Sequence, residues 1–295
     1  MLRGEEAVTG AESYYGRPVL KPPVWKVPDV PLYLYLGGVA GASSTMAVLA
    51  EATGRARLAR AGRLAAAAGA TASVGALVHD LGRPARFLNM LRVLKPTSPL
   101  SVGSWILAPF SALSGAAAAS ELTGVLPGAG RAAATAAGLI APAMTTYTAV
   151  LLADTAVPGW HEAYRELPFV FAGSAVSSAG ACGMLAAPEE SGPARRMAIA
   201  GAVLELAAAR RMHRRAGLVG EVYRQGRAGA VLRTARTLTC IGLGAAALSG
   251  RSGLARTAAG LCLNAAAAAT RYGIFEAGRA SARDPRYTVL PQRAS

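Results

Sequence analysis

The chain has 295 residues, of which 53% are hydrophobic and only 16% are charged, and its mean hydropathy is +0.33. A soluble domain carries about a quarter charged residues and alternates apolar with polar positions at a regular spacing. The long apolar blocks of this chain therefore exclude an ordinary soluble enzyme and indicate an integral membrane protein that crosses the bilayer several times.

The chain is strongly basic, with 31 lysines and arginines against 16 acids and a net charge of +15. Such a charge suits the lipid bilayer with its anionic headgroups, or an acidic partner protein. Nucleic acid is not expected as a partner, because no basic helix, aromatic platform or soluble domain stands apart from the apolar blocks. Cys182, Cys240 and Cys262 lie singly, so neither a zinc site nor an iron-sulfur cluster is expected in this chain.

The polar N-terminal tail, residues 1–30, has no apolar stretch of the kind that precedes a signal-peptide cleavage site. Eight apolar blocks follow, each about long enough to cross a hydrocarbon core of ~30 Å. The blocks cover residues 31–50, 62–79, 102–120, 132–153, 167–187, 194–210, 232–250 and 254–275. We predict an all-α bundle of eight transmembrane helices over residues 31–275, followed by a C-terminal tail over residues 276–295.

Small residues are expected to set the packing of the bundle. Several blocks are dominated by alanine, which contributes little to membrane insertion and is equally a generic helix former. In the first block, Gly37 and Gly41 form a GxxxG pair, the pattern that lets two helices approach closely.

The connections between the blocks are unequal. Those after the second, fourth and sixth blocks are long and polar: His79 to Ser101, Asp154 to Glu166, and Arg210 to Arg236. If eight helices alternate in direction, these connections and both termini share one face of the membrane. Most of the lysines and arginines fall on that face, and the positive-inside rule then favours a cytoplasmic location for it. A basic face shaped to dock an acidic protein is the alternative.

A charged segment broken by a proline, His79 to Met90, follows the second block. Ionisable groups are expensive at the edge of a bilayer, so a cluster of one histidine, one aspartate and two arginines there indicates a ligand site or a pathway.

Six short runs along the chain carry a resemblance to a known family. They are Tyr15–Trp25, Leu34–Gly41, Asp80–Phe87, Lys95–Trp105, Tyr147–Leu152 and Asp284–Val289. Through these runs and their order, the chain resembles the NrfD/polysulfide reductase membrane subunits over nearly its whole length. These subunits anchor multi-subunit oxidoreductases and exchange electrons with quinones.

The resemblance implies an eight-helix subunit of the plasma membrane with no redox centre of its own. A menaquinone headgroup would bind near one face, beside a ferredoxin-like iron-sulfur subunit that connects to a molybdopterin catalytic subunit. A haem is not expected either, because the chain has only three histidines, and two of them, His161 and His213, lie in connections.

A quinone site needs hydrogen-bond donors to the two oxygens and a group that exchanges protons, inside an apolar pocket. The family's polar positions in the first span correspond here to Asp29 and Tyr33, where the relatives carry an amide and an imidazole. A tyrosine that faces the ring corresponds to Tyr147. His79 and Asp80 are then candidate proton relays, and Arg83 a fixed cation beside Asp80.

These assignments have structural alternatives. Tyr33 and Tyr147 would equally suit the aromatic belt at the membrane interface, and Asp80 with Arg83 would equally suit an ion pair that fixes the turn. Asp154 either caps the fourth helix or lines the pocket. Glu205, within the sixth block, has to be protonated or paired, as in a proton path.

The sequence therefore predicts the membrane-anchoring, menaquinone-reactive subunit of a respiratory molybdo-oxidoreductase of the polysulfide, formate or related type. A secondary transporter or proton-conducting membrane protein is the alternative, since eight spans and a buried Glu205 suit it too. A passive anchor without a quinone site is a third possibility.

Overall fold

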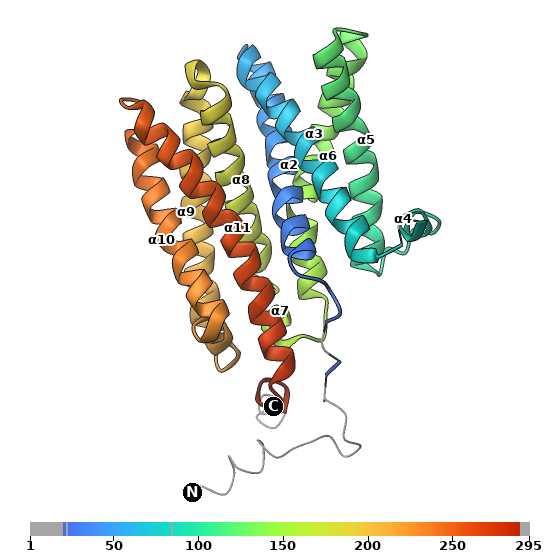
Figure 1. The fold of residues 1–295 in the computed structure, drawn as a ribbon, viewed down its shortest axis with the longest axis vertical. Coiled ribbons are helices and arrows are strands. Elements are labelled where there is room, and N and C mark those ends of the chain that lie inside the picture. Colours follow the sequence, from blue (N-terminus) through green and yellow to red (C-terminus); the bar gives the residue numbers. More distant parts are fainter. Residues whose placement is uncertain (1–19, 22, 84, 290–295) are drawn as a thin grey trace, which may run out of the picture.

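A computed structural model describes residues 20–21, 23–83 and 85–289, and within these ranges helices are the only regular secondary structure. Eight long helices form one elongated bundle (Figure 1). They are α2 (Asp29–Ala52), α3 (Ala56–Leu81), α5 (Pro99–Thr123), α6 (Pro127–Ala153), α8 (Leu167–Ala186), α9 (Ser191–Arg215), α10 (Gly226–Leu248) and α11 (Gly253–Arg283). Four short helical segments lie between them: α4 (Ala85–Met90), α7 (Pro158–His161), η1 (Pro188–Glu190) and η2 (Val219–Tyr223).

Each of the eight predicted blocks lies on one long helix. Among the described residues, six of these helices are long and apolar enough to cross a membrane, namely α2, α3, α5, α6, α8 and α10. The helices α9 and α11 do not meet this criterion, because arginines and glutamates interrupt their apolar residues. The chain is thus a multi-pass membrane protein.

Several helices extend beyond the predicted blocks. The connection predicted from Arg210 to Arg236 is mostly helical, because α9 continues to Arg215 and α10 already begins at Gly226. Arginine is a good helix former, and cations near a helix C-terminus interact favourably with the helix dipole. For the same reason α11 continues to Arg283, so the predicted boundary at residue 275 falls inside a helix. Residues 1–19 and 22 of the predicted N-terminal tail, and residues 290–295 of the C-terminal one, lie outside the described ranges.

The central helix of the bundle is α2, which packs against α3, α6, α8 and α11. Its two GxxxG glycines meet neighbouring helices: a Cβ added at Gly41 would lie 2.9 Å from the Ala141 carbonyl oxygen of α6, and one at Gly37 would lie 3.2 Å from Met144 Cε. A side chain at Gly41 would therefore push α6 away from α2. The glycine pair packs as its spacing predicts.

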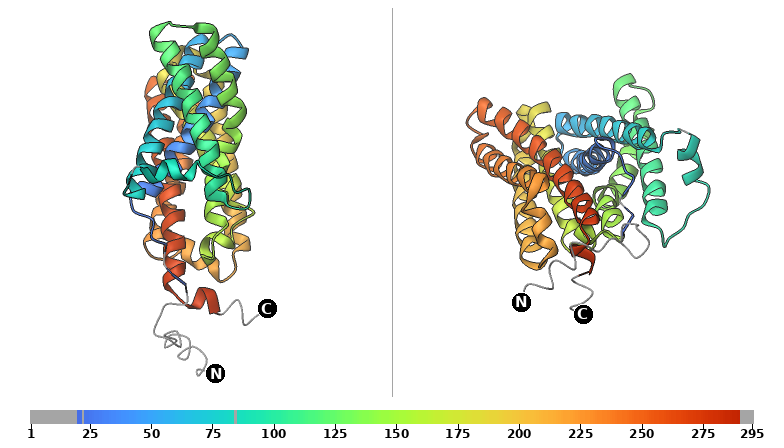
Figure 2. Two further views of the ribbon diagram at one scale, coloured as in Figure 1. Left: turned by 90° about the vertical axis from the view of Figure 1, so that its right-hand side faces the viewer. Right: turned by 60° about the horizontal axis from the view of Figure 1, so that its bottom comes forward.

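The start of α2 and the end of α11 lie at the same end of the bundle (Figure 1). The segments α4, α7 and η2, which belong to the three longer connections, lie toward this end as well, and α4 projects sideways from the bundle (Figure 2). We call this the terminal end and the opposite one the far end. The predicted grouping of both termini with the longer connections is confirmed for the described residues.

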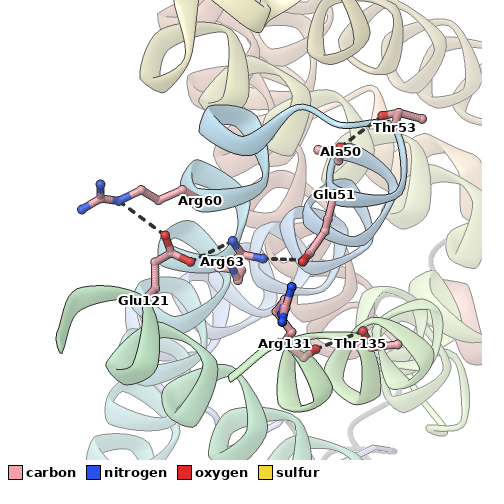
Figure 3. A network of polar contacts seen from close by, with 8 residues as sticks. All are labelled: Ala50, Glu51, Thr53, Arg60, Arg63, Glu121, Arg131 and Thr135. Carbon is pink, nitrogen blue, oxygen red and sulfur yellow. Dashed lines mark hydrogen bonds and ion pairs between the residues drawn. The ribbon is translucent and has the colours of Figure 1, made fainter. Parts of the chain in front are cut away.

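At the far end an ion-pair network joins three helices (Figure 3). The guanidinium of Arg63 on α3 lies 2.6 Å from Glu51 of α2 and 2.8 Å from Glu121 of α5, and only 12% of the Arg63 side chain is exposed. Arg60 adds a longer contact of 3.8 Å to Glu121. Figure 3 also shows Arg131 of α6 pointing toward Glu51. The largely buried guanidinium of Arg63 thus bridges two carboxylates that would otherwise repel each other.

Replacing Arg63 with Gln is expected to lower the free energy of unfolding by roughly 1.5–3 kcal/mol, because two charge-assisted hydrogen bonds are lost in a partly buried site. The loss is measured as a shift of the thermal unfolding midpoint in detergent. The control is Arg57→Gln, which breaks the Arg57–Glu189 pair, whose side chains are both mostly exposed. That change is expected to have almost no effect. Equal shifts for the two variants would contradict the prediction.

Candidate functional site

Two of the predicted site residues meet where α2 begins and α3 ends. The Nδ1 atom of His79 lies 2.7 Å from Asp29 Oδ2, with the ring N–H donating to the carboxylate. Asp29 is the first residue of α2 and its side chain is 13% exposed, whereas that of His79, in the last turn of α3, is 76% exposed. A carboxylate at a helix N-terminus and an imidazole at a helix C-terminus are both favoured by the helix dipoles. The pair therefore joins a buried acid to a base that faces outward.

The N-terminal segment completes this corner of the bundle. The backbone N–H of Lys26 donates to Asp80 Oδ1 at 2.8 Å, and Lys26 Nζ donates to the His79 carbonyl oxygen at 3.3 Å. Beside these contacts lies a cavity of about 410 Å³ that is open to the surface. It is lined by Lys26, Gly75, Val78, His79 and Gly82, of which only Val78 is partly buried. The sequence analysis did not single out Lys26, since no local pattern relates it to residues more than fifty positions away.

Tyr33 and Tyr147 are brought together deeper in the bundle. Their hydroxyl groups are hydrogen-bonded to each other, and the ring centroids lie 6.4 Å apart in an edge-to-face arrangement. Both side chains are buried in the core, and the Tyr147 ring packs against Gly103 of α5. The interfacial-belt alternative is therefore wrong for both residues. One hydroxyl accepts from the other and keeps its own proton available for a further partner.

Tyr33 follows Asp29 by four residues, about 6 Å along the helix. The tyrosine pair thus lies roughly one turn below the Asp29–His79 pair, and neither ring lines the 410 Å³ cavity. The predicted residues form two neighbouring clusters, one at the terminal end of the bundle and one deeper in its core.

The family model for polysulphide reductase NrfD matches residues 19–188, which is more than half of the chain. The chain belongs to the NrfD family. No curated protein matches it closely enough to be called a relative. The matched region of this NrfD chain extends from the N-terminal segment through α8 to the first residue of η1, and so contains both clusters. The helices α9, α10 and α11 lie beyond it.

Two other predicted residues of the NrfD chain lie apart from these clusters. Arg83 is exposed after the end of α3, and among residues 20–21, 23–83 and 85–289 no carboxylate forms an ion pair with it. Asp80 accepts from Lys26 instead, so the predicted Asp80–Arg83 pair is not formed in the structure. Asp154 is the exposed residue that directly follows α6, and it does not line the cavity beside His79.

Glu205 lies in the other half of the NrfD bundle, on α9. It is buried, and its Oε1 accepts a hydrogen bond from Thr270 Oγ1 of α11 at 2.7 Å. Arg271, which follows Thr270 in the sequence, is only 1% exposed. Its Nη2 donates to the Phe171 carbonyl oxygen at 2.7 Å, and its guanidinium lies 3.7 Å from the centre of the Phe171 ring. Within the described part of the chain, Arg271 Nε and Nη1 have no hydrogen-bond partner.

Arg271 was not among the residues predicted from the sequence, although it falls inside the apolar block 254–275. The available signal was a lone arginine close behind the alanine run 265–269, well before the end of a helix. Gly38 of α2 makes room for it, since a Cβ at that position would lie 2.9 Å from Arg271 Nη2. A buried cation in the middle of a membrane protein indicates function more often than packing.

An aromatic cluster links the N-terminal segment to the second half of the bundle. Trp25 stacks on Trp160 of α7 with ring centroids 5.5 Å apart, and Trp160 packs on Phe275 of α11 at 5.6 Å. The indole Nε1 of Trp160 donates to the Ile274 carbonyl oxygen at 2.8 Å, and the Tyr223 hydroxyl donates to the Gly159 carbonyl oxygen. These contacts hold Trp25, and with it the neighbouring Lys26, in place.

Proposed function

We propose that this NrfD protein is the membrane-anchoring subunit of an oxidoreductase complex and that it binds a quinone at the terminal end of α2 and α3. The observation that carries the proposal is the Asp29–His79 pair beside a cavity of about 410 Å³. A proton-exchanging group at the wall of a pocket in the membrane is what quinone chemistry requires.

The residues around this cavity fit a quinone headgroup. Val78 and Gly75 supply apolar surface, while Lys26 and His79 supply hydrogen-bond donors. A bound quinone supplies the exchange of two electrons and two protons. The chain itself positions the ring and moves protons. His79 donates a proton to the quinone, or accepts one from it, at Nε2. Asp29 accepts the hydrogen bond from Nδ1 and stabilises the imidazolium form. Asp80, held by the Lys26 N–H, is the next acceptor toward water.

We propose further that all eight long helices cross the membrane. At about 1.5 Å per residue, α9 and α11 are ~37 and ~46 Å long, which is enough to span. The charges that lower their hydropathy are placed where a membrane tolerates them: Glu205 and Arg271 are buried inside the bundle, and Arg210, Arg214 and Arg215 belong to the last two turns of α9.

The proposed partners follow from the family. We expect menaquinone as the quinone, a ferredoxin-like iron-sulfur subunit docked at the terminal end, a molybdopterin catalytic subunit behind it, and a location in the plasma membrane. The test is copurification: the tagged chain, solubilised in mild detergent, should bring down a protein with the absorption spectrum of an iron-sulfur cluster and should retain extractable quinone. A stable solitary chain that retains no quinone would contradict the proposal.

Replacing Tyr147 with Phe is expected to lower kcat/KM for quinone-linked turnover about tenfold, the effect of one lost hydrogen bond of ~1.4 kcal/mol. The Tyr33 hydroxyl would then lack its buried partner. Steady-state assays of the purified complex with a soluble quinol analogue measure the effect. Tyr164→Phe serves as the control, because Tyr164 is half exposed and lies outside both clusters. Unchanged turnover in Tyr147→Phe together with Asp80→Asn would favour a passive anchor.

Proton conduction is the second candidate function, favoured by the buried Glu205, Thr270 and Arg271 group. Proteoliposomes that contain the chain alone test it, with an enclosed pH-sensitive dye as the readout. Proton flux that Glu205→Gln abolishes would support conduction without a redox partner. Flux that appears only in the assembled complex during quinone turnover would support the first proposal.

A further inference from the structure

A larger cavity, of about 720 Å³, lies in the half of the bundle that the family match does not cover. It opens between α9 and α10, because α9 packs mainly on α8 while α10 packs mainly on α11. Behind this gap, α8 contributes Val170 and α11 contributes Thr270 and Ile274 to the lining. Neither of the clusters at α2, α3 and α6 takes part in it.

One part of the lining is strongly basic. Five arginines contribute to it, all of them exposed: Arg210, Arg214, Arg224, Arg233 and Arg236. Within the described ranges none of the five forms an ion pair with a carboxylate, unlike their neighbours Arg211 and Arg215, which contact Glu166 at 3.4 and 3.3 Å. The cavity therefore presents uncompensated positive charge.

Two of these arginines are held in place by the backbone. Arg224 Nη2 donates to the His213 carbonyl oxygen at 3.0 Å, and Arg233 Nη1 donates to the Arg224 carbonyl oxygen at 2.8 Å. Each guanidinium has five N–H donors, so most remain free for a ligand. The one carboxylate in the lining, Glu205, is buried and accepts from Thr270.

The rest of the lining is apolar and lies beside the lipid-facing surface. Leu206, Ala207 and Leu232 contribute to the wall. On the outer faces of the same two helices, Val203 and Ile241 are each 52% exposed, as expected for side chains in contact with acyl chains. Arg236 lies ten residues after the start of α10, about 15 Å along the helix, so the basic region extends from the connection into the interfacial layer.

We propose that this cavity is a binding site for one anionic phospholipid. The phosphate lies between the arginines of α9 and α10, and an acyl chain lies along Leu206, Ala207 and Leu232. Arginine pairs with phosphate through two parallel hydrogen bonds, and basic pockets between transmembrane helices suit anionic headgroups. Free phosphate would leave the apolar wall uncovered, and a quinone would leave five guanidinium groups without a counter-charge.

The test uses the full-length protein, stripped of lipid in detergent and titrated with phosphatidylglycerol or phosphatidylcholine. Native mass spectrometry counts bound lipid, and the rate of Cys240 alkylation by a maleimide reports filling of the cavity, since Cys240 is exposed and lines it. One phosphatidylglycerol per chain should bind and slow the alkylation of Cys240, while Cys262, which does not line the cavity, provides the internal comparison.

The double variant Arg233→Gln/Arg236→Gln should bind phosphatidylglycerol about tenfold more weakly, because charge-assisted hydrogen bonds to the phosphate are lost. The matched control is Arg92→Gln/Arg283→Gln, which removes two exposed arginines that do not line the cavity and should leave binding unchanged. The Cys240 measurement on the unaltered protein remains decisive even if the double variant folds poorly.

Three outcomes would overturn the proposal. They are equal protection of Cys240 by phosphatidylcholine, protection by inorganic phosphate at similar concentrations, and protection by a menaquinone analogue but not by phosphatidylglycerol. The Asp29–His79 site is tested separately, by quinone-linked turnover in the His79→Gln variant, so the two proposals can fail independently.

Discussion

Replacing His79 with Gln should lower the rate of quinone-linked electron transfer about 100-fold or more, the usual loss when a general acid or base is removed. Glutamine retains a polar side chain but cannot take up a proton. Stopped-flow or steady-state turnover of the purified complex measures the effect.

The companion variant Asp29→Asn distinguishes the two members of the pair. An asparagine can still accept the hydrogen bond from His79 Nδ1 but carries no negative charge, so the rate should fall less than in His79→Gln. His161→Gln is the control, since His161 is exposed on α7 and lies in neither cluster. Wild-type turnover in His79→Gln would exclude the proposed role of the pair.

The second large effect concerns the aromatic cluster at the terminal end. Replacing Trp160 with Ala is expected to reduce the free energy of unfolding by about 3–5 kcal/mol, the range for truncating a buried large aromatic side chain. The indole is fully buried, stacks on Trp25, packs on Phe275 and donates to the Ile274 carbonyl oxygen. All of these contacts disappear together, and the truncation leaves a cavity in a buried cluster.

Thermal unfolding in detergent measures this loss, and limited proteolysis of the N-terminal segment shows whether Trp25 is released. Trp105→Ala is the matched control, because Trp105 on α5 is 42% exposed and should tolerate truncation. Gly278→Ala probes the same contact from the other side, since a Cβ at that position would overlap the Trp160 indole. Equal losses in Trp160→Ala and Trp105→Ala would show that the cluster does not hold this end together.

The helices were predictable because a membrane imposes length and apolarity on each of them. The blocks from 31–50 to 254–275 each lie on a long helix, and the connections that carry α4, α7 and η2 lie toward the predicted end. The helix ends were less predictable. Arginine runs such as 210–215 are as compatible with a helix as with a connection, so charge alone does not mark where α9 stops.

The candidate site was predictable only in part. Resemblance and residue type placed Asp29, Tyr33, His79 and Tyr147 at one end, and the structure brings them into two pairs. The contact of Lys26 with Asp80 was not predictable, because it depends on where a proline-rich segment folds back across α3. The prediction that Arg83 would pair with Asp80 used only closeness in the sequence. In the structure the chain turns at Gly82, which has a left-handed φ of 70°. The Asp80 carboxylate accepts a hydrogen bond from the Lys26 N–H and not from Arg83.

Trp25 and Lys26 are adjacent residues, but their side chains contact different halves of the protein. Lys26 binds His79 and Asp80 of α3, and Trp25 lies on Trp160 and Phe275 of α7 and α11. Under the proposed function, a subunit that docked against α7 and displaced it would also move Trp25, and through the adjacent Lys26 the wall of the cavity beside His79. Binding of that subunit and of a ligand in the cavity would then be coupled, and each would alter the affinity for the other by the same factor.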